Sequence, residues 1–194
     1  KSTPERLKAL VTQAITNYNI EYLNDFNTTL RYSKFNSTID NSDTSIVSNL
    51  TELQIYKKLK PQIGIGQNIK VDFNVSLVND LPELPDQHSS FDRHTISSSL
   101  FKYNGIECII EDNGSGILKI VQPTANLHKK IIDIGTVNYD TGTINLINFN
   151  IDSYEGNELK IYAKSKDSDI TVGKNTILLI EPSEIKLIIE TVRV

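Results

Sequence analysis

The strongest constraint on the fold is a run of strict alternation between residues 69 and 77. Ile69, Val71, Phe73, Val75 and Leu77 are apolar, and polar residues occupy every position between them. Successive side chains of a β-strand point to opposite faces of the sheet. The run therefore predicts a strand with one face in a core and the other face in a polar environment.

Strand patterns continue from this run to the end of the sequence. The chain contains 27 Ile, and β-branched residues favour strands. Tight hairpin turns are predicted at Asp112–Gly116 and Asp140–Gly142, because Asp, Asn and Gly favour such turns between strands. The predicted strands are Ile106–Ile110, Ile117–Val121, Val137–Tyr139, Thr143–Phe149, Leu159–Ala163, Thr176–Ile180 and Ile185–Val192. Helices do not alternate with these strands, which argues against a parallel α/β fold.

Helical periodicity is confined to the first quarter of the chain. Apolar residues recur there at spacings of three and four, and Ser2, Thr3 and Pro4 suit a helix start. Thr16-Asn17 is a possible second cap, and we expect it to divide the segment into two short helices. A further helical turn is predicted over Ser33 to Asn41.

These patterns together predict an α+β fold, with a small helical N-terminal lobe followed by a predominantly antiparallel β lobe. We expect residues 1–80 to form the helical and β N-terminal lobe and residues 100–194 to form the β lobe. Residues 81–99 contain two Pro, two His and a run of Ser, and are predicted to be a loop or linker.

Composition narrows the possible functions. The net charge is −4, from 20 basic and 24 acidic residues without a basic stripe, so we expect no nucleic-acid partner. Cys108 is the only cysteine, which excludes an internal disulfide, and its apolar neighbours predict a buried, inert thiol.

The location of the protein is predicted from two missing signals. No apolar stretch approaches the about 20 residues of a membrane span, and no signal peptide opens the chain. An intracellular, soluble protein is therefore expected. Because the first residue is Lys1, we expect the chain to be a piece of a longer protein.

Motifs that resemble ligand sites are better explained as turns. Gly64-Ile65-Gly66 begins like a dinucleotide-binding loop, but Ile69 stands where a third Gly would belong and a strand follows. Glu111–Gly116 is acidic, yet the twelfth residue counted from Asp112 is Pro123, where a calcium loop requires Glu. A hairpin turn is therefore expected at Asp112–Gly116, and a turn at Gly64–Gly66.

No catalytic, cofactor-binding or metal-binding residue is predicted. His88, His94 and His128 lack metal-ligand spacing and have no neighbouring Cys, so loop histidines are the expected interpretation. A Gly-x-Ser-x-Gly nucleophile motif is absent, and nothing in the sequence places two carboxylates in a shared cleft. The sequence thus predicts a protein that is not an enzyme and that takes no cofactor or small-molecule substrate.

Several segments resemble a family of phage structural proteins. Ala14 to Leu23 is similar to the baseplate-J-like proteins of contractile tails, where an apolar-Thr step opens a helix carrying a Tyr. Phe26–Phe35 and Ile39–Ile46 resemble the C-terminal half of the baseplate wedge subunit encoded by gene six in T-even-like myophages. Segments that agree in order follow at Phe101–Gly105, Asp112–Gly116, Gly135–Gly142 and Asn175–Ile180.

The resemblance implies architecture and assembly rather than catalysis. It implies a wedge component that dimerises, contributes to a ring around the central hub and contacts other wedge proteins. Its expected location is the tail baseplate of the virion, after assembly in the host cytoplasm.

Two alternatives remain open at this level. The first is an extracellular adhesin or carbohydrate-binding β module, which is supported by the β-rich pattern and by five Asn-x-Ser/Thr sequons. The sequons lie at Asn27, Asn36, Asn49, Asn74 and Asn113. The second is an enzyme whose site is assembled from the polar loop between Asn79 and Ser99.

Overall fold

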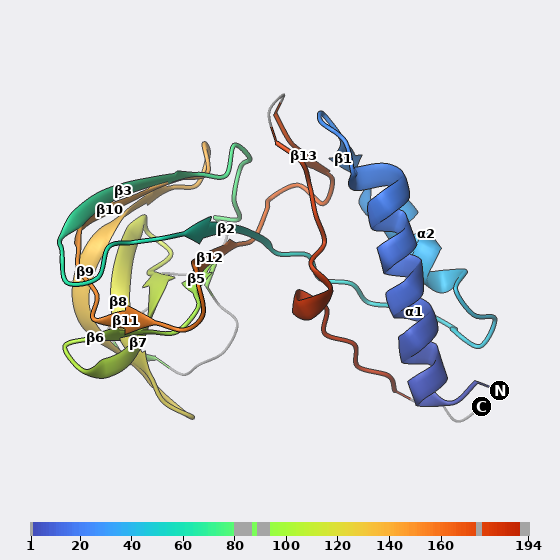
Figure 1. Ribbon diagram of the computed structural model, residues 1–194, viewed down its shortest axis with the longest axis horizontal. Coiled ribbons are helices and arrows are strands. Elements are labelled where there is room, and N and C mark those ends of the chain that lie inside the picture. Colours follow the sequence, from blue (N-terminus) through green and yellow to red (C-terminus); the bar gives the residue numbers. More distant parts are fainter. Residues whose placement is uncertain (1, 80–86, 89–93, 174–175, 191–194) are drawn as a thin grey trace. The chain divides into compact units, whose positions relative to one another are not determined.

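The computed structural model describes residues 2–79, 87–88, 94–173 and 176–190 (Figure 1). The chain divides into two compact units. A helical unit comprises Lys1–Glu52 together with Ser168–Val194, and a sheet unit comprises Leu53–Asp167. The predicted α+β class is confirmed, with a helical start followed by a sheet that is mostly antiparallel.

The helical unit begins with α1 (Pro4–Tyr18), which continues directly into a π-helical turn, η1 (Asn19–Leu23). The Thr3 side chain caps α1 by accepting a hydrogen bond from the Arg6 backbone N–H at 3.3 Å, as the sequence predicts. The predicted division at Thr16-Asn17 is wrong. The Thr16 hydroxyl donates to the Thr12 carbonyl at 2.8 Å, a bond back along the helix that leaves the helix continuous.

The second helix, α2 (Tyr32–Asp40), confirms the helical turn predicted over Ser33 to Asn41. Its Phe35 and Ile39 are buried at a spacing of four residues. Phe35 packs edge-on against Tyr18 of α1, with the two ring centroids 5.1 Å apart. Pairing of one apolar stripe from each helix forms the small core of this unit.

The C-terminal segment of the chain completes the helical unit. Strand β1 (Thr29–Leu30) pairs antiparallel with β13 (Ile170–Thr171), and Phe26 forms an isolated bridge with Ile177. The Asn19 side chain accepts a hydrogen bond from the Ile180 N–H at 3.1 Å and donates to the Ile180 carbonyl at 3.4 Å. Strand pairing and a side-chain amide therefore hold together segments that are up to 161 positions apart in the chain.

The sheet unit is a curved antiparallel sheet (Figure 1). Hydrogen-bonded neighbours run in the order β2-β12-β5-β7-β8-β9-β10-β3, with β4 on β9 and β6 joining β7 to β11. The strands are β2 (Ile55–Leu59), β3 (Gln67–Asp72), β4 (Gln87–His88), β5 (Ile96–Ser98), β6 (Phe101–Tyr103), β7 (Ile106–Asp112), β8 (Ile117–Pro123), β9 (His128–Asn138), β10 (Thr143–Phe149), β11 (Ser153–Tyr154) and β12 (Leu159–Ala163).

One hydrophobic core lies inside this unit and receives side chains from strands far apart in the sequence. Phe101 and Phe149 meet edge-on there with centroids 5.6 Å apart, and Cys108 is fully buried as the sequence predicts. Burial raises the pKa of the Cys108 thiol to about 11, so the thiol is protonated at neutral pH. The two predicted hairpins are confirmed, since β7–β8 and β9–β10 are joined at Asp112–Gly116 and Asp140–Gly142.

The alternating run at 69–77 has the predicted faces but a shorter strand. Val71, Phe73 and Leu77 are buried, which confirms the predicted register. Regular pairing with β10 ends at Asp72, and Asn74 adopts a left-handed backbone with φ 59°. The strand breaks there because the left-handed region is incompatible with an extended chain.

Two other expectations differ from the structure. Thr176–Ile180 and the described part of Ile185–Val192 form no regular strand; a 3-10 turn, η2 (Pro182–Glu184), lies between them, and residues 191–194 are outside the described range. The predicted lobe boundaries, at residues 80 and 100, also differ from the observed ones, since the sheet unit runs from Leu53 to Asp167. The difference arises because the pairings of β3 with β10 and β1 with β13 are non-local. Most of the predicted linker, 81–99, lies outside the described residues, but its end forms β5.

Candidate functional site

A buried carboxylate lies at the centre of the sheet unit. Glu111 is near the end of β7 and is 2% exposed. Its cross-strand neighbours are Ser97 of β5 and Lys119 of β8. Side chains alternate along β7, so Glu111 projects from the face opposite to Ile110, which belongs to the hydrophobic core. An ionisable carboxyl group is thus placed in the sheet with little access to water, and such a group requires a hydrogen-bonding or charged partner.

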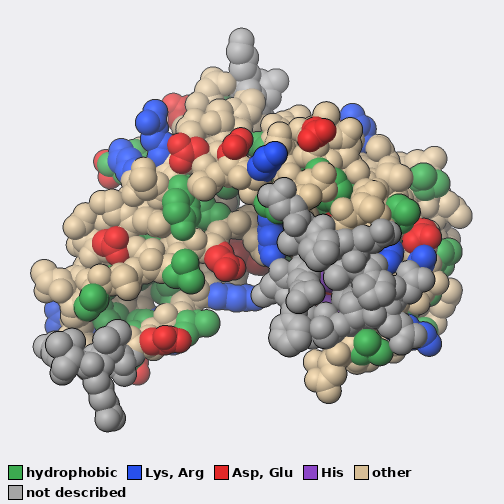
Figure 2. All heavy atoms as spheres, turned by 180° about the vertical axis from the view of Figure 1, so that it is seen from behind, with side chains coloured by type: hydrophobic (Ala, Val, Ile, Leu, Met, Phe, Trp, Pro, Cys, Tyr) green, Lys and Arg blue, Asp and Glu red, His purple; other side chains and the backbone are tan. Residues whose placement is uncertain are grey.

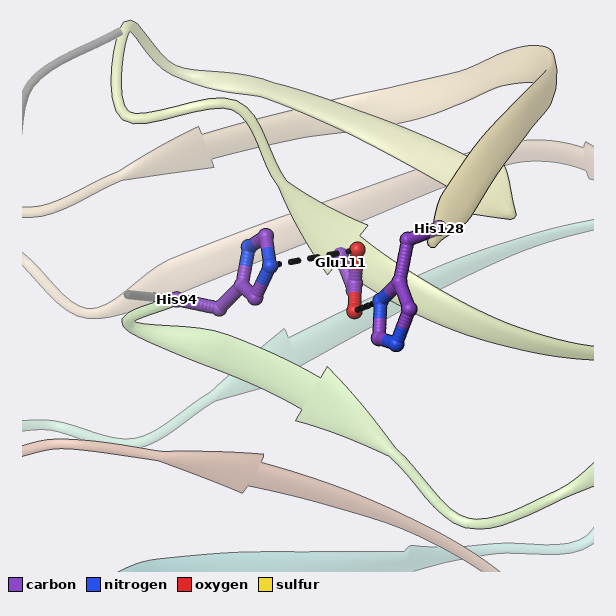
Figure 3. A group of neighbouring side chains, drawn as sticks. All are labelled: His94, Glu111 and His128. Carbon is purple, nitrogen blue, oxygen red and sulfur yellow. Dashed lines mark hydrogen bonds and ion pairs between the residues drawn. The ribbon is translucent and has the colours of Figure 1, made fainter. Parts of the chain in front are cut away.

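Two imidazoles supply that partner (Figure 3). His94, just before β5, places Nε2 3.3 Å from Oε2 of Glu111. His128, the first residue of β9, contacts Oε1 of Glu111 through Nδ1. The His94 and His128 side chains are 8% and 12% exposed, and their rings are nearly parallel, with centroids 6.2 Å apart. We call these three residues the His–Glu–His cluster.

The second ring nitrogen of His94 fixes where its proton lies. Nδ1 is 3.1 Å from the backbone carbonyl oxygen of Asp112. A carbonyl only accepts hydrogen bonds, so Nδ1 carries the hydrogen and donates it. In the neutral imidazole, Nε2 then presents its lone pair toward a carboxylate oxygen of Glu111. Two electron-rich atoms facing each other at 3.3 Å need a proton or a cation between them.

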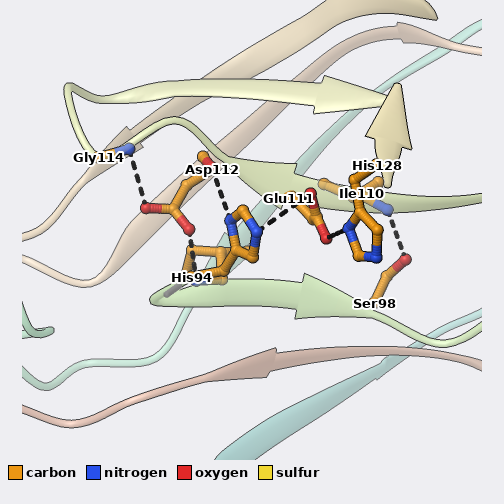
Figure 4. Close-up of polar contacts among 8 residues, drawn as sticks. His94, Ser98, Ile110, Glu111, Asp112, Gly114 and His128 are labelled. Carbon is orange, nitrogen blue, oxygen red and sulfur yellow. Dashed lines mark hydrogen bonds and ion pairs between the residues drawn. The ribbon is translucent and has the colours of Figure 1, made fainter. Parts of the chain in front are cut away.

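The turn that follows Glu111 is held by hydrogen bonds within the protein (Figure 4). The Asp112 carboxylate accepts from the Ile96 N–H at 2.8 Å, the Tyr139 hydroxyl at 2.7 Å and the Gly114 N–H at 3.3 Å. Because the Ile96 bond ties β5 to the end of β7, it fixes the chain beside His94. The cluster therefore lies on a backbone that is positioned by other strands rather than on an isolated loop.

The Asn113 side chain closes the same hairpin. Its amide oxygen accepts from the N–H groups of Ser115 and Ile117, both at 2.9 Å. The oxygens of Asp112 and Asn113 are thus engaged by protein donors, which is the arrangement expected of a hairpin turn rather than of a calcium loop.

The buried surroundings of the cluster shift the pKa of its carboxyl group and of a neighbouring tyrosine. Burial raises the pKa of Glu111 to about 8, the charge of Asp112 adds to the rise, and Lys119 opposes it. Lys119 is itself only 6% exposed. Burial and the neighbouring Asp112 also raise the pKa of Tyr139 above its ordinary value.

The cluster offers three ligand atoms to a metal ion. One atom each from His94, Glu111 and His128 lies within 4.8 Å of the other two. Two imidazoles with one carboxylate form a ligand set used by zinc and other first-row divalent metals. Sequence spacing gave no sign of this set, because Glu111 and His128 lie in different strands, His94 lies just before a third, and the three meet through the pairing of β5, β7, β8 and β9.

The other sequence candidates have simpler structural explanations. Gly64–Gly66 is a turn before β3, as predicted, with Gly64 at φ 74°. His88 lies in β4, opposite His128 in the register, and its side chain is outside the described residues, as are residues 80–86 and 89–93 of the Asn79–Ser99 loop.

Exposed apolar side chains mark a second kind of candidate site in the helical unit. Val47 and Leu50 are 82% and 91% exposed, and Ile188 is 86% exposed. All three lie in segments without regular secondary structure.

On the face shown in Figure 2, basic and acidic side chains are interspersed and form no block of one sign. None of the helices in the described part of the chain has the length and apolar character of a membrane span.

Comparison with known proteins bears on the helical unit. Residues 1–58 match the family model of baseplate structural protein gp6, C-terminal domain III. This match covers α1, η1, β1 and α2 and extends into β2. No curated protein matches the chain.

A structural comparison gives a much weaker similarity. The tailspike protein of Acinetobacter phage vB_ApiP_P1 has 11% identity and a TM-score of 0.26, covering 66% of this chain and 24% of that one. A score this low does not show a shared fold. The family match confirms the resemblance over residues 1–58, which contain Phe26–Phe35 and Ile39–Ile46, and it supports a gp6-like baseplate structural protein. The similar segments noted from Phe101 onward lie outside the matched residues.

Proposed function

We propose that the chain is a wedge component of a contractile phage tail baseplate, without enzymatic activity. In this proposal it self-associates as a dimer that contributes to a ring, and it binds other wedge proteins. It acts in the virion baseplate, after assembly in the host cytoplasm. The observation that carries the proposal is the match of residues 1–58 to gp6 C-terminal domain III.

The exposed surface of the helical unit supports an assembly role. Leu50 and Ile188 are the kind of large apolar side chain that costs free energy when it remains in water. Exposed apolar side chains can supply the apolar part of a contact with another protein. Both residues lie in segments without regular secondary structure, and the mixed surface charge suits polar contacts around such residues.

A substitution at this surface tests the proposal directly. Leu50→Asp places a charge on a side chain that is 91% exposed, so we expect folding to be retained. Assembly is expected to fail, because a charge would then be buried against a neighbouring subunit. Incorporation into baseplates, measured by sedimentation and electron microscopy of particles from cells that supply the variant, gives the readout.

The matched control is Ile147→Asp, which changes an exposed Ile of β10 in the sheet unit that is 58% exposed. We expect this variant to assemble normally. Normal assembly of Leu50→Asp would exclude this surface as the contact. Baseplates that form with normal morphology when the chain is absent would refute the structural function itself.

A further inference from the structure

We propose that the His–Glu–His cluster binds one divalent transition-metal ion, with zinc as the best match, and that the ion joins β5, β7 and β9 of the sheet unit. The ligands would be Nε2 of His94, a carboxylate oxygen of Glu111 and one ring nitrogen of His128. This inference does not depend on the proposed assembly function, because it concerns the sheet unit, whereas the family match lies almost entirely in the helical unit.

The geometry of the ligand atoms carries the first step. Zinc binds imidazole nitrogen at about 2.0–2.1 Å and carboxylate oxygen at about 2.0–2.2 Å, usually with tetrahedral angles. Two ligands at those lengths and angles are separated by about 3.3–3.5 Å. His94 Nε2 and Glu111 Oε2 are 3.3 Å apart, so an ion can bind both with little movement of either side chain.

The orientation of His94 carries the second step. Imidazoles that ligate metals usually donate their other N–H to a carboxylate or a backbone carbonyl, which fixes the tautomer and directs the lone pair at the ion. His94 has this arrangement, with Nδ1 3.1 Å from the Asp112 carbonyl oxygen. The Asp112 side chain is in turn held by the Ile96 N–H and the Tyr139 hydroxyl. The outer partners of a metal ligand are therefore already in place.

Burial carries the third step and selects the class of ion. With Glu111 2% exposed and the two imidazole side chains 8% and 12% exposed, an ion here would lose most of its water shell. Magnesium and calcium prefer several oxygen ligands, and magnesium gives up water reluctantly. Two nitrogens with one oxygen suit zinc, cobalt, nickel or copper instead. A three-residue ligand set leaves the fourth tetrahedral position for a water molecule or an additional side chain.

A simpler arrangement would be a hydrogen-bonded triad in which protons alone join the two imidazoles to the carboxylate. The two arrangements differ in their response to added metal. The hydrogen-bonded triad does not bind an ion, whereas the metal site binds one ion per chain and is stabilised against unfolding by it.

The experiment uses the full 194-residue chain after dialysis against a chelator. Isothermal titration with Zn²⁺ is expected to show one ion per chain, and the melting temperature is expected to rise with Zn²⁺ concentration. X-ray absorption spectra of the zinc-loaded protein should show two imidazole ligands, with nitrogen and oxygen donors only. Absence of binding, or a spectrum with oxygen donors alone, would overturn the proposal and leave the hydrogen-bonded triad.

Variants locate the binding site. Glu111→Gln keeps the shape of the side chain while removing its charge, and His94→Ala and His128→Ala each remove one ligand. Loss of an outer-shell partner alone reduces metal affinity about 10- to 100-fold, so each of these changes is expected to weaken Zn²⁺ binding at least about 100-fold. The matched control is Glu107→Gln, which alters an exposed carboxylate on the same strand and should leave affinity unchanged.

Two outcomes of the variant series would refute the assignment. If the three cluster variants bind Zn²⁺ as tightly as the control, the ion lies elsewhere on the chain. If circular dichroism shows that an alanine variant is unfolded, Glu111→Gln and the absorption spectrum of the wild-type protein still decide the question.

Discussion

Phe73 provides the most direct test of how the sheet unit is held together. Its side chain is 6% exposed and belongs to the core that also contains Val71 and Leu77. Replacing a buried Phe by Ala removes apolar contact and leaves a cavity, which costs about 3–5 kcal/mol of unfolding free energy. A domain of this size loses about 4 °C of melting temperature per kcal/mol, so Phe73→Ala is expected to lower Tm by about 10–20 °C.

Urea titration of the full chain, followed by circular dichroism, measures this loss. The neighbouring Asn74 supplies the matched comparison because it is exposed and has a left-handed backbone with φ 59°. Asn tolerates that conformation better than Ala, so Asn74→Ala is expected to cost about 1 kcal/mol. Asn74→Gly should stay within about 0.5 kcal/mol of the wild type, since Gly has no Cβ to strain. If Phe73→Ala unfolds with the midpoint of the wild type, then Phe73 is not in the core and the register of β3 against β10 is wrong.

Four further outcomes are expected. The isolated chain should form at least a weak dimer at high concentration by analytical ultracentrifugation; a strict monomer would assign self-association to other parts of the assembly. Gly135→Ala should destabilise the sheet unit by at least about 1–3 kcal/mol in denaturant titration, because a Cβ there would lie 2.0 Å from the Asn145 carbonyl oxygen; an unchanged midpoint would contradict the close approach of β9 and β10. Phe35→Ala, which removes the edge-on contact with Tyr18, should cost the helical unit about 3–5 kcal/mol, and a loss below about 1 kcal/mol would show that the two helices do not share a core. Hydrogen bonds from Ser45 and Ser2 lower the pKa of Asp43 to about 2 from 3.8, so the advantage of the wild type over Asp43→Asn should be complete above pH 3.8 and disappear as pH falls through about 2; a pH-independent difference would refute this linkage.

The parts of the fold that follow from local sequence were predictable. Thr3-Pro4 with a three- and four-residue apolar spacing gives α1, and Asp140-Thr141-Gly142 between two strand patterns gives the β9–β10 hairpin. Both depend on interactions among residues near each other in the chain, which propensity and periodicity describe well.

Errors occurred where distant residues decide the local structure. Thr176–Ile180 has the composition of a strand, yet its bonds to the first part of the helical unit are an isolated bridge to Phe26 and an amide contact with Asn19. At Asn74 the alternating pattern continues while the backbone leaves the ladder: the Phe73 N–H still bonds to the Gly142 carbonyl, in register with the Asp72–Thr143 pair, and the next residue is left-handed. The alternation of apolar and polar residues is the same before and after this position, so it does not show where pairing with β10 ends.

The His–Glu–His cluster shows the same limit at the level of function. Metal motifs are recognised in sequences when their ligands lie on one helix or one short loop, where spacing fixes geometry. Here Glu111 and His128 come from different strands and His94 from the segment just before β5. The pairing of β5 with β7 brings Glu111 to His94, and the pairing of β8 with both β7 and β9 brings it to His128. In the sequence, Glu111 directly follows the apolar run Ile106–Ile110 and precedes Asp112 and Asn113, so it resembles the start of the polar turn rather than a buried residue. Its burial follows from strand pairing on both sides, with Ser97 of β5 and Lys119 of β8, and a carboxyl group buried in this way needs a proton, a base or a cation beside it.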